Sequence, residues 1–75
     1  MEKKIIKIIC DRLLLKNVTT QSVLADLVQN ETIDIIAIIM DLEEKFHIDI
    51  FDEDIDKFKT VQNLIDYIKV TKKVN

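Results

Sequence analysis

The sequence predicts an all-α fold: a small four-helix bundle with three main helices and one short helix. Apolar residues recur at intervals of three and four along most of the chain, which is the spacing of an amphipathic helix. Glycine and proline are both absent, and tight β-hairpins usually need glycine. The chain has 75 residues, of which 48% are hydrophobic. We therefore expect a single domain over residues 1–75 with a modest core.

The first predicted helix covers residues 2–16. Its basic residues in the body and last turn suit the negative, C-terminal end of the helix dipole. Its apolar stripe, which one arginine interrupts, consists of Ile5, Ile8, Ile9, Arg12 and Leu13. A polar loop is expected over 17–21. Residues 22–27 then form either a short helical turn or an irregular apolar anchor, whose inward-facing residues are Val23, Leu24 and Leu27.

The second main helix is predicted over residues 32–46, with Asn30, Glu31 or Thr32 as its cap. Asparagine and threonine are good cap residues, and a glutamate is favoured near the positive end of the helix dipole. One face consists of Ile35, Ile39, Leu42 and Phe46, and it is widened by Ile36, Ile38 and Met40. Because this helix is apolar over much of its circumference, it is expected at the centre of the bundle.

The remaining elements are short. Residues 47–51 form an extended connector, and Asp52 caps a helix of one or two turns over 53–58. Thr60 caps the last helix over 61–70, whose buried stripe consists of Val61, Leu64, Ile65 and Ile68.

The two ends of the chain, residues 1–2 and 71–75, are expected to fray. No run of about 18 apolar residues without charge is present, so no membrane span is expected. The first residues lack the apolar core and the small-residue cleavage site of a signal peptide. Cys10 is the single cysteine, which excludes an internal disulfide and fits a reducing cytoplasm.

The net charge of −3 hides an uneven distribution of charge. Residues 1–16 and 57–75 are basic, whereas residues 17–56 hold eleven acidic residues against Lys45 alone. Phosphate would be repelled by such a surface, so nucleic acid is an unfavourable partner. A partner with a basic patch is favoured, because complementary charge speeds encounter and sets orientation. The simpler alternative is that these acids only keep a small protein soluble.

Catalytic and metal sites are not supported by the residues. His47 is the single histidine and has no serine or cysteine neighbour that would form a nucleophile pair. The acidic run over 49–56 lacks the glycine and the alternating oxygen ligands of a calcium loop. We expect no catalytic residue and no metal ligand, and therefore a protein that is not an enzyme.

Two stretches carry a specific motif. The first reads Asp-Leu-Val-Gln-Asn-Glu-Thr-Ile-Asp over 26–34 and leads into a helix that ends in Leu-Glu-Glu-Lys-Phe over 42–46. The second reads Thr-Val-Gln-Asn-Leu-Ile-Asp-Tyr-Ile over 60–68. Together they resemble the acyl carrier proteins, which have Asp-Ser-Leu at the head of the second helix. Here Thr32 stands at the serine position, Glu31 stands at the aspartate position, and the preceding loop is one residue longer and has Val28 where the family has glycine.

The resemblance implies a cytoplasmic, non-enzymatic and monomeric carrier. Such a carrier presents thioester-bound acyl groups to partner enzymes of fatty acid or related acyl metabolism. It implies 4′-phosphopantetheine on Thr32, and as partners a phosphopantetheinyl transferase and acyl-processing enzymes with basic patches. The acids that would dock these enzymes are Glu31, Asp34, Glu43, Glu44, Asp52 and Asp56. The positions that would line the acyl chain are Ile36, Leu42, Phe46, Ile50, Phe58, Leu64 and Ile68.

Alternatives remain at this point. Threonine adds a methyl group that crowds the hydroxyl and restricts its χ1, so the chain could be a carrier-like protein-interaction module that has lost phosphopantetheine attachment at Thr32. It could also be an acidic helical bundle unrelated to carriers. The acyl-lining positions could be the core of any such bundle, and Thr32 could be an ordinary threonine of a first helical turn.

Overall fold

The computed structural model describes the backbone of residues 1–74 and the side chains of residues 1–72. Its elements in chain order are α1 (Glu2–Leu13), α2 (Leu24–Leu27), α3 (Glu31–Phe46), the 3-10 helix η1 (Asp52–Lys57) and α4 (Val61–Val74). In the described part of the chain the only β-type pairing is one isolated bridge between Val23 and Thr60. The all-α prediction of three main helices is therefore confirmed, with two short helices in place of one.

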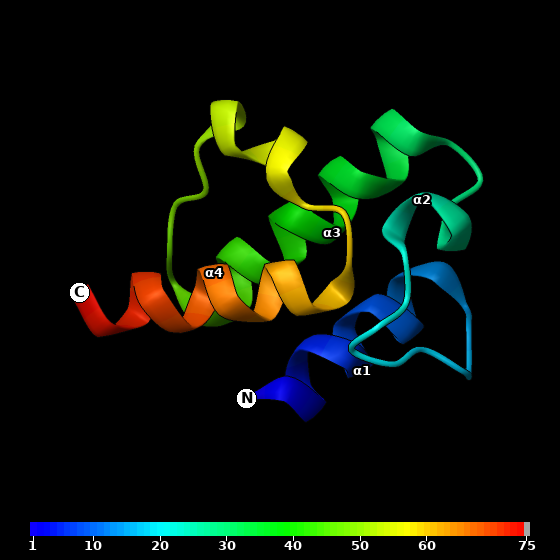
Figure 1. Cartoon of the computed structure of the whole chain (residues 1–75), viewed down its shortest axis with the longest axis horizontal. Coiled ribbons are helices and arrows are strands. Elements are labelled where there is room, and N and C mark those ends of the chain that lie inside the picture. The colour runs from blue at the N-terminus through cyan, green and yellow to red at the C-terminus, as the bar shows by residue number, and fades with distance from the viewer. Residues whose placement is uncertain (75) are drawn as a thin grey trace.

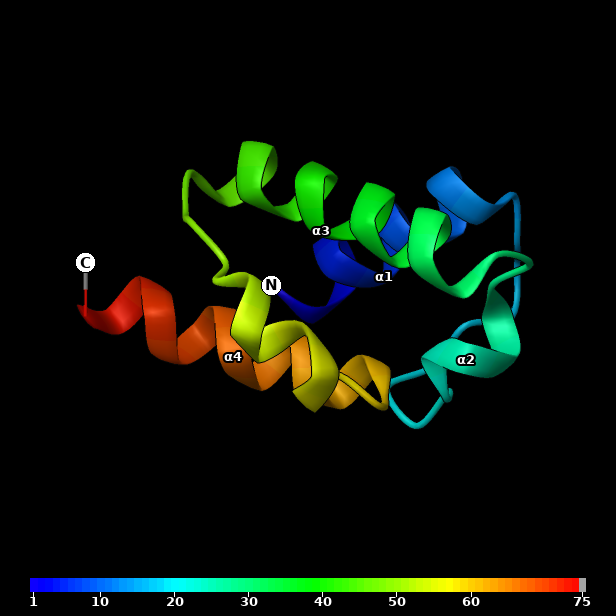
Figure 2. The ribbon, with the colours of Figure 1, turned by 90° about the horizontal axis from the view of Figure 1, so that it is seen from above.

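The three long helices pack around one apolar core. α1 contacts both α3 and α4, and α3 lies across from α4 when the molecule is seen from above (Figure 2). The buried residues are Ile5, Ile9, Val18, Leu24, Ile38, Ile39, Leu42, Phe46, Ile48, Ile50, Phe58, Val61, Leu64, Ile65 and Ile68. Removing each such side chain from water contributes roughly 1.5–3 kcal/mol, which offsets the entropy lost on folding.

Two helix ends differ from the prediction by several residues, whereas α3 and η1 are shifted by a single residue. The backbone explains the first large difference. α1 ends at Leu13 because Leu14 adopts the left-handed conformation, with φ 57° and ψ 46°. The backbone N–H groups of Leu14 and Leu15 both donate to the carbonyl of Cys10. α4 continues past its predicted end at residue 70 to Val74. Asn75 lies outside the described residues.

One of the three candidate caps of α3 and the predicted cap of α4 are confirmed, whereas the predicted cap of the short helix is wrong. Asn30 caps α3, since its side chain accepts a hydrogen bond from the N–H of Ile33. Thr60 caps α4, since its hydroxyl accepts from the N–H of Asn63 at 3.2 Å. Asp52, in contrast, lies inside η1, and no side chain caps this helix at Phe51.

Some residues assigned to buried faces are exposed. Val23, next to α2, is 43% exposed. Ile36 and Met40 are 44% and 61% exposed, so the buried face of α3 is narrower than predicted. Arg12 does not join the core of α1. Its guanidinium instead donates two hydrogen bonds of 2.7 Å to the carboxylate of Asp41 on α3. The hydrogen bond from Arg12 lowers the pKa of Asp41.

η1 lies over α4, as Figure 1 shows. Backbone hydrogen bonds join the chain before α2 to the chain that enters α4: Ser22 accepts from Val61 at 3.0 Å, and Lys59 accepts from Leu24 at 2.9 Å. The start of α4, η1 and α2 are thus held side by side next to the N-terminal half of α3. This arrangement places the site described next.

Candidate functional site

Thr32 is the second residue of α3 and is exposed. Asn30, and not Thr32, provides the cap. Among the described residues neither the Thr32 hydroxyl nor the backbone N–H groups of Glu31 and Thr32 has a hydrogen-bond partner. The hydroxyl is therefore open to a reagent, and the two free N–H groups at the positive end of the helix can donate hydrogen bonds to a phosphate oxygen.

The loop before Thr32 is fixed by side chains from the helix. One carboxylate oxygen of Asp34, Oδ2, accepts hydrogen bonds from the backbone N–H of Gln29 at 2.9 Å and of Asn30 at 3.1 Å. Asn30 in turn accepts from Ile33 at 2.9 Å. Thr32 lies in sequence between these reciprocal contacts, so its backbone is held on both sides although the loop contains no glycine.

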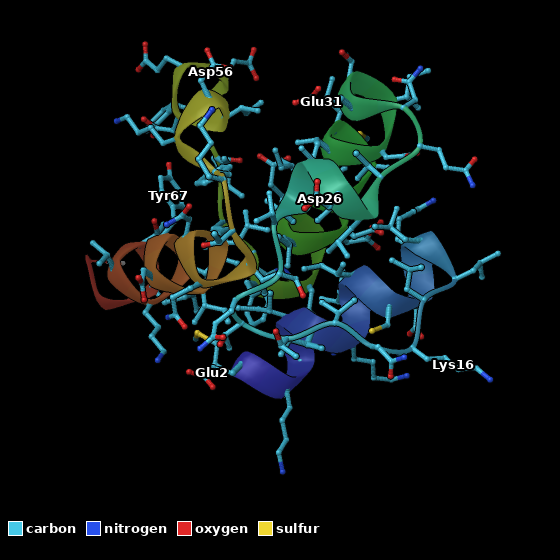
Figure 3. All side chains as sticks on the ribbon, turned by 45° about the vertical axis from the view of Figure 1, so that its right-hand side comes forward. Glu2, Lys16, Asp26, Glu31, Asp56 and Tyr67 are labelled. Atoms are coloured by element: carbon cyan, nitrogen blue, oxygen red, sulfur yellow. The ribbon has the colours of Figure 1, made fainter. Side chains whose placement is uncertain are left out.

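A cleft of about 400 Å³ opens beside Thr32, between α2, α3 and the chain from η1 to α4. Thr32 itself is one of its lining residues. The apolar walls are formed by Val23, Leu24, Ala25, Ile35, Ile36, Ile55 and Phe58. Three exposed charged residues complete the lining: Glu31, Asp56 and Lys59. In Figure 3, Glu31 and Asp56 lie on the same upper side of the molecule, on separate elements.

The cleft involves only part of the predicted acyl-lining set. Ile36 and Phe58 line it, whereas the other five positions are buried in the core away from it: Leu42, Phe46, Ile50, Leu64 and Ile68. These five belong to the helical core of this structure, and their role in lining an acyl chain stays a prediction. The prediction also missed the walls that come from α2 and from Ile55. The sequence did contain a signal for these walls: apolar residues on two very short helices have little core of their own to join, which favours a surface cleft between them.

The wall made by η1 is held by a polar contact to α4. The Tyr67 hydroxyl donates to Asp54 Oδ2 at 2.8 Å, and Lys57 Nζ donates to Asp54 Oδ1 at 2.9 Å. The hydrogen bonds from Lys57 and from Tyr67 lower the pKa of Asp54. The rings of Tyr67 and Phe58 meet edge to face, with centroids 5.1 Å apart. Figure 3 shows Tyr67 rising from α4 toward η1, so α4 holds Phe58 against the cleft.

The six acids predicted to dock partners fall into two groups. Asp34 and Glu43 are partly buried and bonded to the backbone, Glu43 through Oε2 to the N–H of Ile50 at 2.9 Å. The other four acids are exposed: Glu31, Glu44, Asp52 and Asp56. In the described part of the chain, no group of three or more histidine, cysteine or acidic residues could hold a metal ion, and no helix is long and apolar enough to cross a membrane.

Comparisons with known proteins agree with this geometry. The family described as "Phosphopantetheine attachment site" matches residues 3–68. The acyl carrier protein of Buchnera aphidicola subsp. Schizaphis graminum (strain Sg) is 43% identical over 70 residues, which cover 91% of this chain and 89% of that protein. The acyl carrier protein of Buchnera aphidicola subsp. Baizongia pistaciae (strain Bp) is 39% identical over 71 residues, which cover 92% of this chain and 91% of that protein.

These matches favour the carrier over the alternative of an interaction module that has lost its cofactor. The relatives are named as carriers and not as catalysts. The family model is named for the attachment of phosphopantetheine, and its match includes Thr32. This chain belongs to the acyl carrier protein family, whose cofactor is 4′-phosphopantetheine.

Proposed function

We propose that this chain carries acyl groups as thioesters on a 4′-phosphopantetheine arm attached to the hydroxyl of Thr32. The single observation that carries this proposal is an exposed hydroxyl without a hydrogen-bond partner in the described chain, at the N-terminus of α3 and on the lining of an apolar cleft. When bound, the arm supplies the thiol that holds the acyl group.

The residues around Thr32 fit such a group. In attachment, the Thr32 oxygen forms a bond to the phosphorus of the arm while the pyrophosphate bond of coenzyme A breaks, so that adenosine 3′,5′-bisphosphate leaves and the hydroxyl proton passes to solvent. The phosphodiester's negative charge then lies next to the first turn of a 16-residue helix. The helix dipole and the N–H groups of Glu31 and Thr32 favour an anion at this place. The cleft offers apolar surface from Ile35 and Phe58 to the acyl chain, which removes it from water.

The exposed acids among the predicted set supply the contacts to partner enzymes. They are Glu31, Glu44, Asp52 and Asp56. Enzymes with basic patches, a phosphopantetheinyl transferase among them, are steered by this charge, and the effect falls as salt is added. The proposed role is in fatty acid or related acyl metabolism of the cytoplasm, with the carrier acting as a monomer.

The test is the intact mass of the protein after incubation with coenzyme A and a broad-specificity phosphopantetheinyl transferase. The expected result is the gain of one arm, mapped by proteolysis to Thr32. T32A should gain nothing. S22A is the matched control, because Ser22 is the only serine in the chain and its hydroxyl already accepts a hydrogen bond from Thr19. A gain on T32A, or a gain lost in S22A, would place the arm elsewhere.

A negative result on the parent protein is resolved by T32S. If T32S gains the arm and the parent does not, the transferase still docks and the threonine methyl group blocks the reaction. Thr32 is then not the attachment residue in the parent, and the proposed function is refuted.

A further inference from the structure

The contacts of Asp34 separate it from the other acids near the attachment residue. Its Oδ2 accepts from two backbone N–H groups, those of Gln29 and Asn30. Within the described residues, Oδ2 is the only hydrogen-bond acceptor of these two N–H groups. The carbonyl of Asn30 accepts in return from the N–H of Asp34 at 2.9 Å. The loop that leads to Thr32 is therefore held at its last two residues by one carboxylate.

The start of α4 has the same arrangement with an uncharged acceptor. Oδ1 of Asn63 accepts from the backbone N–H of Lys59 and of Thr60, both at 2.9 Å, while the Thr60 hydroxyl accepts from the N–H of Asn63. Both are reciprocal caps, in which a side chain of the first helical turns binds the chain before the helix. An uncharged amide oxygen is thus sufficient to bind the two backbone N–H groups before a helix, so the negative charge of a carboxylate is not required for this cap.

We propose that Asp34 is a positioning residue, which fixes the junction between the loop and α3 so that the Thr32 hydroxyl is presented in one place, and that it is not one of the acids that dock partner enzymes. The proposal rests on attachment at Thr32. Its physical reason is that transfer to a hydroxyl depends steeply on placement, since a displacement of about 1 Å can lower a rate by about 100-fold. A β-branched hydroxyl has few rotamers with which to correct a misplaced backbone.

The kinetic test compares D34N with D34A in the transfer of the arm from coenzyme A, in both the Thr32 and the T32S backgrounds. D34N keeps an acceptor oxygen and loses the charge, whereas D34A loses both. If Asp34 positions the hydroxyl, D34A should lower kcat by about 10-fold or more with KM within about twofold, and D34N should keep most of kcat. An equal rise of KM in both variants, with kcat unchanged, would make Asp34 a docking acid and overturn the proposal.

The matched control is Glu44 on the same helix, whose side chain is exposed and makes no hydrogen bond within the described residues. E44Q and E44A both remove its charge and neither removes a backbone contact. They should raise KM alike and leave kcat near that of the parent, because a docking acid acts through charge. Thermal unfolding of all four variants checks that each is folded at the assay temperature.

A second readout does not depend on the transferase. Amide hydrogen exchange at Gln29 and Asn30, followed by NMR in the unmodified protein, should be at least threefold faster in D34A than in the parent, with D34N between them. Unchanged exchange in D34A would overturn the proposal whatever the kinetics show. If exchange is faster in D34A but neither the Thr32 protein nor T32S accepts the arm, Asp34 does hold the loop, and it is the proposed function that has failed.

Discussion

Replacing Leu14 with glycine should stabilise this protein. Leu14 ends α1 with φ 57°, in the left-handed region, although it is not glycine. An L-residue with a Cβ atom loses roughly 1–2 kcal/mol in this region, and glycine does not. The side chain is 89% exposed, so its removal sacrifices little packing. The chain has no glycine at all, so the native protein keeps the cost of the left-handed conformation at Leu14.

The net gain is smaller than the backbone penalty. Glycine also makes the unfolded chain more flexible, which opposes folding by about 0.4–1 kcal/mol. We expect L14G to raise the free energy of unfolding by about 0.5–1 kcal/mol, which for a domain of this size raises Tm by about 2–8 °C. The measurement is equilibrium unfolding in guanidinium chloride followed by circular dichroism at 222 nm, together with thermal melts.

Two further variants make this reasoning refutable. H47G should behave like L14G, because His47 ends α3 with φ 55°. K4G should destabilise by about 1 kcal/mol, because Lys4 is exposed and lies inside α1, where glycine is unfavourable. If L14G unfolds at the same or a lower denaturant concentration than the parent, the left-handed residue is not a source of strain and the argument fails.

Three other changes test the site and its supports. A25F places a ring in the cleft from an exposed position on α2. The arm should still attach, and hydroxylamine should cleave a bound acyl thioester faster than in the parent. Equal cleavage rates would show that the cleft does not shelter the acyl chain. Asp54, whose pKa is lowered by the hydrogen bonds from Lys57 and Tyr67, contributes stability that is present above about pH 4, its unfolded value, and is lost as the pH falls through its folded pKa. The Tm difference between the parent and D54N, measured from pH 7 to pH 2.5, should therefore shrink below about pH 4, and a constant difference would contradict this origin. E43A leaves the largely buried backbone N–H of Ile50 without an acceptor. It should lower the free energy of unfolding by about 1–3 kcal/mol in chemical unfolding, and E43Q should lower it clearly less. Equal losses in the two variants would show that the charge of Glu43, and not its hydrogen bond, causes the effect.

The sequence was sufficient for the helices but not for their ends. Periodicity located α3 and α4, because a buried stripe at helical spacing has few alternative structures. The end of α1 could not be predicted, since the usual stop signals are glycine and proline and the chain contains neither. The stop lies instead in the conformation of Leu14, a residue that is common inside helices.

The candidate site was predicted in outline and not in detail. The position of Thr32 followed from the motif around it. The cleft did not follow, because burial and cleft lining both select apolar residues: Leu42 and Ile36 have the same pattern, yet only Ile36 lines the cleft. The role of Asp34 was also hidden, because a carboxylate that binds its own backbone and one that faces a partner look alike in a sequence.

The helix dipole gives an independent reason to divide the acids of α3. A carboxylate is favourable near the N-terminus of a helix and unfavourable near its C-terminus, and Glu43 and Glu44 lie in the last turns of α3. Glu43 is compensated by its hydrogen bond to Ile50. The Glu44 side chain has no hydrogen bond or ion pair among the described residues, so nothing in the fold offsets its position. If Glu44 contacts a partner as proposed, reversing its charge should weaken enzyme docking without removing a side-chain contact within the fold.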